Sequence, residues 1–536
     1  MITRRLAALS DRALWLTIGA ALFALSAWPL LLVELPPFQD LPNHVASAYI
    51  ARHPEIYPDY VFNGLWKANS ALELWLHQFA DDHLMSAARA FVAIVLAVNA
   101  FVLPWFVLQL AGRRTMVTAS LLIWPLVHSF CLAMGMCNFA LAVPLSLIVL
   151  VLLGRQRTAP GAGLAIATVA LSVAAWVAHP FPLIVVGGVC LIEALARRDR
   201  WWRAAATLLP LAPIAVLIAG TALHHLIKAD GAPVAASRGF AFLTPWELPL
   251  HYWLDASGAF TRWGSATVIP AIALAVLAWR RRREPAPLTG WATVAVIVLY
   301  LGLPLMISNW WYLNSRMVPF VWIVLAVRVP PALPRWLAAL LVASALGFSA
   351  ALGVDYLRLD RDRAELTAGI DAVPARATLL PLLFHHRRTS DYTASLTHTW
   401  GYYVLAKQTS APLVFAVERS YAITYRTFPP PALIPPALDR FAELNATPAQ
   451  LCERAPPAAT HLADCTAIWQ LLWSQFWAEA EPRFSHVLTW AMPPEARAMM
   501  PASYRVVFAA GDLAIWARGG GSAMSSTQPP GAPAAR

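Results

Sequence analysis

Long stretches without a charged residue are the feature that most constrains this chain. Forty uncharged residues lie between Arg114 and Arg155, and another 35 lie between Arg157 and Glu193. A helix of about 20 apolar residues crosses the hydrocarbon core of a bilayer. Each stretch is therefore long enough for two membrane-spanning helices.

The composition excludes the usual soluble classes. Hydrophobic residues make up 59% of the 536 residues and charged residues only 13%, against about 25% charged in soluble proteins. The 24 Trp and 22 Phe residues exclude a disordered chain. The net charge of +11 comes from short basic clusters between apolar runs. A basic groove with interleaved aromatics would look different, so we expect no nucleic-acid partner.

We predict an α-helical polytopic membrane protein with about 11 transmembrane helices. The expected spans are 13–33, 90–110, two within 115–154, two within 158–192, 204–223, 264–279, 288–307, one ending at 327, and 336–354. With the N-terminus in the cytoplasm, 17 of the 24 basic residues before position 355 fall in cytoplasmic loops, as the positive-inside rule requires. The C-terminal region then lies in the periplasm, outside a bacterial inner membrane.

The polar segments divide the chain further. Residues 1–354 are expected to form the transmembrane domain, with outer loops at 34–89 and 224–263. Residues 355–519 are expected to form a soluble periplasmic α/β domain, with strands near 379–383, 413–417, 487–488 and 513–516 and a helix over 467–480. Residues 520–536 have the composition of a disordered tail. Cys452 and Cys465 form either a disulfide or two buried free thiols.

The segment after the first span carries the most informative polar residues. Asp40 and His44 lie four residues apart, and a helix beginning at Pro42 places Asp40 near the positive end of its dipole. An ionised carboxylate there can accept a proton from a hydroxyl group, and His44 can orient it or share the proton. The alternative is that Asp40 only caps the helix and His44 is an ordinary interfacial residue.

Arg316 is the second candidate, because only 11 uncharged residues separate it from Arg328. Eleven residues cannot span a bilayer, so Arg316 lies in the outer part of the tenth span or at its mouth. A guanidinium there is costly unless it meets an anion, and Arg binds phosphate through a fork of N–H donors. The alternative is a side chain that reaches out to the lipid phosphates.

Weaker candidates share the same side of the membrane. His179 lies at an outer turn, Tyr312 precedes Arg316, and His225 and Arg262 belong to the second outer loop. Together they could line a wet cavity; an interfacial belt is the alternative. The sequence has no Walker A loop, HExxH motif or paired CxxC motifs. We therefore expect no metal site and no cofactor, with a divalent metal left open.

Several short motifs resemble those of a known superfamily. They are residues 39–44 (QDLPNH), 135–140 (GMCNFA), Ser315-Arg316 and 397–404 (THTWGYYV). With the architecture above, they make the chain similar to the GT-C superfamily of polytopic membrane glycosyltransferases. Within it, protein O-mannosyltransferases and aminoarabinose transferases are distant relatives by this resemblance.

The resemblance implies inverting transfer of a sugar from a polyprenyl-phosphate donor to a periplasmic glycan, lipid or protein acceptor. By position, Asp40 is the base with His44 beside it, and Arg316 binds the donor phosphate. His179 and Tyr312 are assigned to the phosphate side, and Asn43, Asp59, His225 and Arg262 to the acceptor or cavity side. The better-studied members tend to show paired acids in the first loop, whereas Gln39 and Leu41 flank Asp40 here. Asp59 or Glu55 is available as a second carboxylate.

A non-enzymatic function is the alternative from a different class. A lipid or polysaccharide transporter, or a scaffold for envelope assembly, would also be polytopic. A transporter often shows inverted repeats with broken helices, and none is recognisable by eye. A scaffold has no need for an ionised carboxylate beside an intramembrane guanidinium. The relative positions of Asp40 and Arg316 in space therefore discriminate between the two classes.

Overall fold

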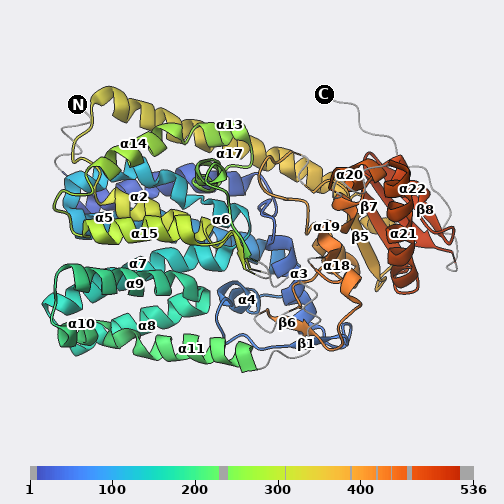
Figure 1. Cartoon of the computed structure of the whole chain (residues 1–536), viewed down its shortest axis with the longest axis horizontal. Helices are drawn as coiled ribbons and strands as arrows, with labels where there is room; N and C mark the ends of the chain where they lie inside the picture. Colours follow the sequence, from blue (N-terminus) through green and yellow to red (C-terminus); the bar gives the residue numbers. More distant parts are fainter. Residues whose placement is uncertain are drawn as a thin grey trace.

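A computed structural model describes residues 9–227, 240–307, 310–386, 389–417, 421–435, 437–454 and 462–519. Roughly parallel helices form one end of the molecule, and a mixed helix–sheet region forms the other (Figure 1). Shorter elements lie between these two ends. The predicted tail 520–536 lies outside the described residues.

Apolar helices make up the first end. They are α2 (Asp11–Ala27), α5 (Leu84–Val127), α7 (Cys137–Thr158), α8 (Ala162–Ala178), α9 (Pro180–Ala196), α10 (Trp201–Leu208), α11 (Ala212–Ile227), α14 (Ile269–Arg280), α15 (Gly290–Gly302), α16 (Val318–Ala326) and α17 (Arg335–Thr367). Side-chain caps fix some of their starts: Ser10 accepts from the backbone N–H of Ala13, and Thr289 from that of Ala292. Gly112 has non-helical torsions (φ 80°, ψ 174°) and divides α5 in two.

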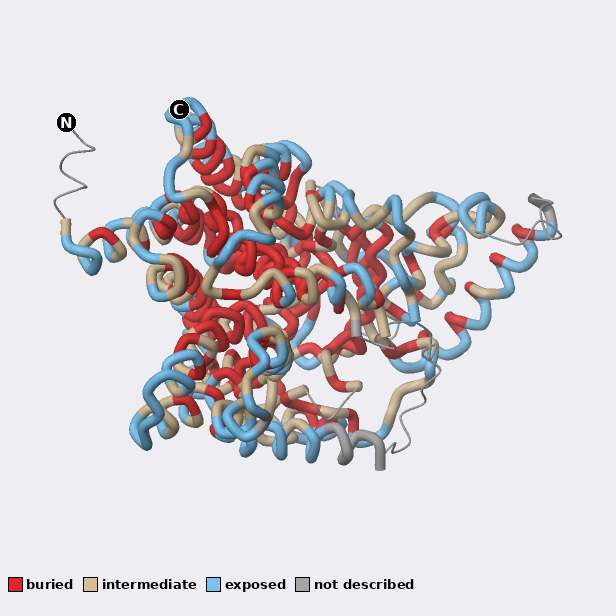
Figure 2. The backbone as a smooth tube through the Cα atoms, turned by 60° about the vertical axis from the view of Figure 1, so that its left-hand side comes forward, coloured by how far each residue is buried: buried red, intermediate tan, exposed pale blue. Residues whose placement is uncertain are grey.

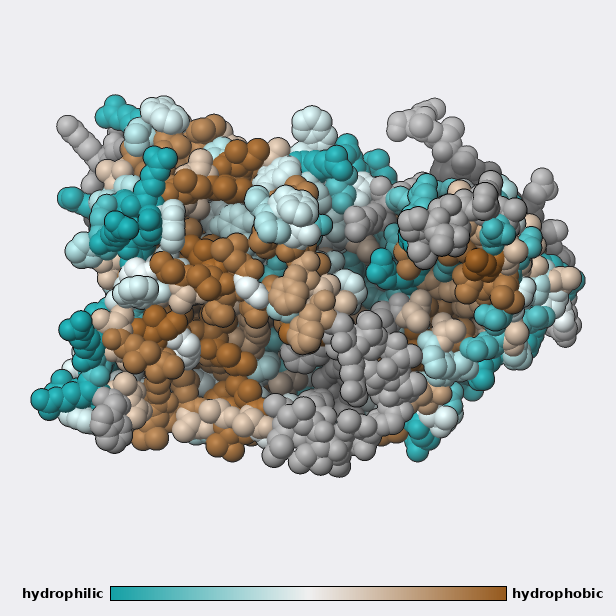
Figure 3. Space-filling view, viewed as in Figure 1, coloured by the Kyte–Doolittle hydropathy of each residue, from teal (hydrophilic) through white to brown (hydrophobic). Residues whose placement is uncertain are grey.

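The helices have the length and surface of a membrane protein. In the described residues, six helical stretches are long and apolar enough to cross a membrane, and four apolar helices are shorter. The break at Gly112 divides the longest stretch, which gives eleven apolar segments. In the most apolar part of the stretch Trp202–Thr221, only 11% of the residues are buried inside the protein. Its exposed apolar side chains therefore need a lipid environment. Figure 3 shows hydrophobic residues gathered over the helical end. The chain is a polytopic α-helical protein, as predicted.

The C-terminal region is α/β, also as predicted. Its sheet has the order β5-β7-β9-β8, built from Leu379–Leu383, His486–Trp490, Leu513–Arg518 and Tyr504–Ala510; β5 and β7 are parallel and the other pairs antiparallel. Helix α21 (Leu462–Ala480) contains the predicted helix. The last apolar helix, α17, continues to Thr367, so the predicted boundary at residue 354 lies inside it.

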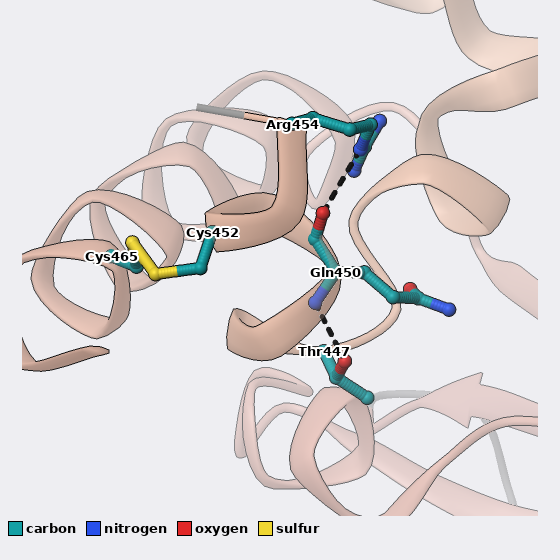
Figure 4. The surroundings of a disulfide bond; sticks show 5 residues. All are labelled: Thr447, Gln450, Cys452, Arg454 and Cys465. Atoms are coloured by element: carbon teal, nitrogen blue, oxygen red, sulfur yellow. Dashed lines mark hydrogen bonds between the residues drawn. A yellow bond between two sulfur atoms is a disulfide. The ribbon is translucent and has the colours of Figure 1, made fainter. Parts of the chain in front are cut away.

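The structure tests two predictions for the C-terminal region: the strand at 413–417 and the state of Cys452 and Cys465. The strand predicted at 413–417 is wrong: this segment is irregular because the Leu413 carbonyl and the Phe415 N–H bond the Asn43 side chain and not a neighbouring strand. Strand β8 was not predicted, since its buried and exposed residues do not alternate regularly. Of the two alternatives for Cys452 and Cys465, the structure contains the disulfide, which joins α20 (Pro448–Arg454) to α21 (Figure 4).

A middle layer connects the two ends. It contains α3 (Leu41–Arg52), α4 (Ala71–Leu76), α6 (Phe130–Ala133), α18 (Gly401–Lys407) and α19 (Ala437–Leu444) (Figure 1). Strand β1 (Tyr60–Phe62), from the first outer loop, pairs antiparallel with β6 (Ile423–Tyr425) from the C-terminal region. Buried residues run through the middle of the molecule without interruption (Figure 2). The first loop and the C-terminal region therefore share one core.

Candidate functional site

Asp40 lies in the middle layer, at the start of α3. Its backbone N–H donates to the Met134 carbonyl (3.2 Å), and that of Gln39 donates to the Ala133 carbonyl (3.2 Å). Asp40 occupies the N-cap position, but its side chain accepts no capping hydrogen bond. The carboxylate is therefore not used to start the helix, which removes the capping interpretation.

Gly135 explains how the backbone at Asp40 is held. It has a φ of +88°, a conformation that favours glycine. A Cβ atom at this position would lie 2.7 Å from the Asp40 backbone nitrogen and 2.8 Å from the Asp40 Cβ. The turn between α6 and α7 therefore packs directly on Asp40, and only a residue without a side chain fits there.

Two donors reach the same oxygen of the Asp40 carboxylate. Gln39 Nε2 lies 3.4 Å from Asp40 Oδ1, and His398 Nε2 lies 3.5 Å from it. Gln39 is itself oriented, because its Oε1 accepts a hydrogen bond from the Ala394 backbone N–H (2.8 Å). Among the described residues no hydrogen bond to Oδ2 is found. The Asp40 side chain is 20% exposed, so Oδ2 is available to a substrate group.

The buried pair of His44 and Glu73 lies one helical turn further along α3. His44 Nδ1 is 2.8 Å from Glu73 Oε1, and both side chains are largely buried. Asn138 Nδ2 donates to Glu73 Oε2 (3.2 Å). Burial lowers the pKa of His44, but the hydrogen bond and charge of Glu73 and the charge of Asp40 outweigh it and raise this pKa. Burial raises the pKa of Glu73, but His44 and Asn138 outweigh it and lower this pKa. Each group of the pair therefore stabilises the charged form of the other.

Arg316 and His179 form a second cluster at the outer ends of the helices. Arg316 lies in the short helix η4 (Ser315–Met317), and its Nη1 is 3.0 Å from His179 Nε2. His179 Nδ1 caps α9 by accepting from the Phe181 N–H (3.2 Å). A neutral imidazole has a single acceptor nitrogen, so His179 accepts from the Phe181 N–H or from Arg316 Nη1 but not from both. One N–H donor of this cluster is therefore left without an acceptor on His179.

Other donors of this cluster are also unmatched. Within the described chain, Arg316 Nε and Asn314 Nδ2 are buried without a hydrogen-bond partner, and Arg316 forms no ion pair. The Phe139 ring lies 5.6 Å from the guanidinium carbon. The Asp40 carboxylate interacts electrostatically with Arg316, so the two clusters lie within electrostatic range of each other.

The remaining predicted residues make other contacts in the structure. Tyr312 packs its ring edge-on against Phe130 (5.4 Å), and its backbone carbonyl accepts from the Arg316 N–H (3.1 Å). Asp59 is exposed beside β1 and binds the Arg426 N–H through its carbonyl. Arg262 is exposed, and its backbone N–H donates to Asp391. His225 belongs to α11, and its side chain lies outside the described residues.

Sequence reasoning missed several members of the site. Glu73 is the carboxylate that pairs with His44 and was not among the predicted residues; the sequence offers Asp59 or Glu55 as a second carboxylate to accompany Asp40. Asn138 and His398 fall inside the motifs at 135–140 and 397–404 that resemble the superfamily. These motifs are the sequence signal that could have identified both residues as members of the site. Asn43 is fully buried and binds the C-terminal segment. In the described part of the chain, no three His, Cys, Asp or Glu residues gather as metal ligands.

Comparison with solved structures shows a likeness of fold. The chain is similar to the solved structure of ArnT from Cupriavidus metallidurans in the apo state, with 12% sequence identity and a TM-score of 0.48 over 95% of this chain and 98% of that chain. No protein-family model matches the sequence, and no curated protein matches it in sequence. Likeness at this level transfers neither a substrate nor residue roles to this chain.

Proposed function

We propose that the protein is a membrane glycosyltransferase that moves a sugar from a polyprenyl-phosphate donor to an acceptor hydroxyl, with inversion. The observation that carries this proposal is the pairing of a partly exposed carboxylate, Asp40, with a set of unmatched donors around Arg316, within electrostatic range of each other. The first is suited to remove a proton and the second to bind an anion.

The Arg316 cluster supports an anionic leaving group. Buried N–H donors without an acceptor are unfavourable, and Arg316 Nε and Asn314 Nδ2 are such donors in the described chain. A phosphate oxygen placed near them would accept their hydrogen bonds. Such donors act in a partly buried site without reorganisation when charge develops on the leaving group. The polyprenyl chain would then lie along the apolar helices.

The reaction follows from these positions. The acceptor hydroxyl loses its proton to Asp40 Oδ2 while its oxygen attacks the anomeric carbon of the sugar. The bond between the anomeric carbon and the donor phosphate oxygen breaks, and the phosphate leaves with the electron pair. The donor is already activated, so a nucleotide-binding loop is not required.

The disulfide supports the proposed side of the membrane. Disulfides persist in oxidising compartments such as the bacterial periplasm, and Cys452–Cys465 joins two C-terminal helices. We therefore place the site and the C-terminal region in the periplasm, at the outer face of a bacterial inner membrane, with the N-terminus in the cytoplasm. The acceptor is then a periplasmic glycan, lipid or protein.

A transfer assay tests the proposal. The purified protein is given a panel of polyprenyl-phosphate hexoses and pentoses, and sugar release or transfer is measured. We expect Asp40→Asn to reduce the rate by about 10²–10⁴-fold, as for loss of a general base, and Arg316→Ala by about 10²–10³-fold. Asp82→Asn, an exposed acid of the same outer loop, is the control. Full activity in both site variants would remove the enzymatic proposal and favour a transporter or scaffold.

A further inference from the structure

The Asn43 side chain fixes the proton position on His398. Its Oδ1 accepts from the Phe415 backbone N–H (3.1 Å), so the amide can be oriented in only one way. Its Nδ2 then donates to the Leu413 carbonyl (3.1 Å) and faces His398 Nδ1 (3.2 Å). His398 Nδ1 must therefore be the acceptor. The hydrogen bond made by one ring nitrogen decides which nitrogen carries the proton, and here it is Nε2.

The protonated nitrogen of His398 faces Asp40. His398 is 3% exposed, and its Nε2 lies 3.5 Å from Asp40 Oδ1. The contact with Asn43 thus directs the Nε2–H of His398 toward Asp40 Oδ1, the oxygen to which Gln39 donates a hydrogen bond.

We propose that His398 is a positioning residue for the base: with Gln39 it holds Asp40 Oδ1 and thereby presents Oδ2 to the acceptor hydroxyl. This inference rests on the proposed function. It assigns part of the site to the C-terminal region, because the groups that fix both donors, Ala394 N–H for Gln39 and Phe415 N–H for Asn43, come from residues 394–415. The periplasmic region thus completes the catalytic geometry rather than lying beside it.

Several charged or titratable groups interact electrostatically with Asp40. They are His44 on the same helix, His398 before α18, Arg316 in η4, Cys137 at the start of α7 and Asp439 in α19. Of these, His398 has an N–H directed at Asp40 Oδ1 that depends on the tautomer. A donor beside a carboxylate favours its charged form, so we expect the acidic limb of the pH–rate profile to lie at higher pH in a variant without this donor.

Matched variants test the role of His398. His398→Leu removes the donor, and His398→Gln keeps an N–H in a similar place. His386→Leu is the control, because His386 is a buried histidine of the same region (6% exposed) whose Nδ1 contacts Thr397 Oγ1 and not Asp40. All variants are compared by kcat, KM, the pH–rate profile and thermal stability of the full chain.

We expect His398→Leu to lower kcat by about 10–100-fold, as for other partners that orient a reactive group, with little change in KM. The acidic limb of its pH–rate profile shifts to higher pH, while His398→Gln stays close to wild type in both measures. His386→Leu loses similar stability but keeps its kcat. Equal losses of kcat in the two Leu variants, no rescue by Gln, or an unmoved acidic limb would overturn the inference. Activity of Asp40→Asn itself would instead overturn the proposed function.

Discussion

The polar groups around Asp40 and those around Arg316 differ in how fully they are hydrogen-bonded. Around Asp40 the polar groups find partners: Gln39, Asn43, His44 and Glu73 are all hydrogen-bonded. Around Arg316, the buried Nε of this residue and Nδ2 of Asn314 have no hydrogen-bond partner among the described residues. A satisfied network is rigid and stabilising, whereas unmatched buried donors are unfavourable. In the proposed function, the Asp40 side is formed before substrate binds, and the Arg316 side gains its missing acceptors from the donor phosphate.

Removing Glu73 should have the largest effect on stability. Glu73→Ala leaves the buried His44 imidazolium and the Asn138 amide without their common partner. Loss of one member of a buried ion pair costs roughly 3–5 kcal/mol. We expect a large fall in the thermal unfolding midpoint of the detergent-purified protein. Glu55→Ala, at an exposed position in the same loop, is the control, and an equal midpoint in both variants would contradict the satisfied network on the Asp40 side.

Replacing Gly135 should have the next largest effect. In Gly135→Ala the left-handed backbone costs about 1–2 kcal/mol, and the added Cβ collides with the Asp40 backbone. We expect moderate destabilisation together with loss of transfer activity, because Asp40 must shift. The comparison is Gly154→Ala, where nothing lies within 4 Å of the added atom. Unchanged activity in Gly135→Ala would show that the position of Asp40 is not held by this contact.

The stability contributed by the His44–Glu73 pair should depend on pH. The folded pKa of His44 is raised above its unfolded value. Its contribution is therefore fully present below the unfolded value of about 6.5 and is lost as pH rises through the folded pKa. We expect the difference in unfolding midpoint between wild type and His44→Gln to shrink with increasing pH above neutrality. A difference that grows in this direction would contradict the ionised pair.

Replacing Arg316 should have the smallest effect on stability, near zero or slightly stabilising. Arg316→Gln removes a buried guanidinium with an unpartnered Nε, and His179 can still accept from the Phe181 N–H, so the loss of the Arg316 contact is offset. We expect inorganic phosphate or a polyprenyl phosphate to raise the unfolding midpoint of wild type but not of Arg316→Gln. A marked loss of stability without ligand, or equal stabilisation of both proteins by phosphate, would show that Arg316 serves the fold and not an anion.

The two sides of the site also differ in how far the sequence predicted them. Asp40 and Arg316 were both visible as polar residues at the ends of apolar runs. Arg316 and His179, 137 residues apart, meet as predicted members of one group. Glu73 and His398 were not predicted, because nothing in the spacing of residues within a segment shows which distant segment packs against it.

The sequence by itself determined the apolar segments, the α/β character of the C-terminal region and the chemistry available at Asp40 and Arg316. These depend on run length and residue type, which are local properties. Only the tertiary structure decided that His398 contacts Asn43, 355 residues away in the chain, and lies beside Asp40. It also decided that Glu73 pairs with His44 and that the backbone of Leu413 and Phe415 bonds the Asn43 side chain. Such contacts are set by the packing of whole elements, where one buried polar group selects its partner from any part of the chain.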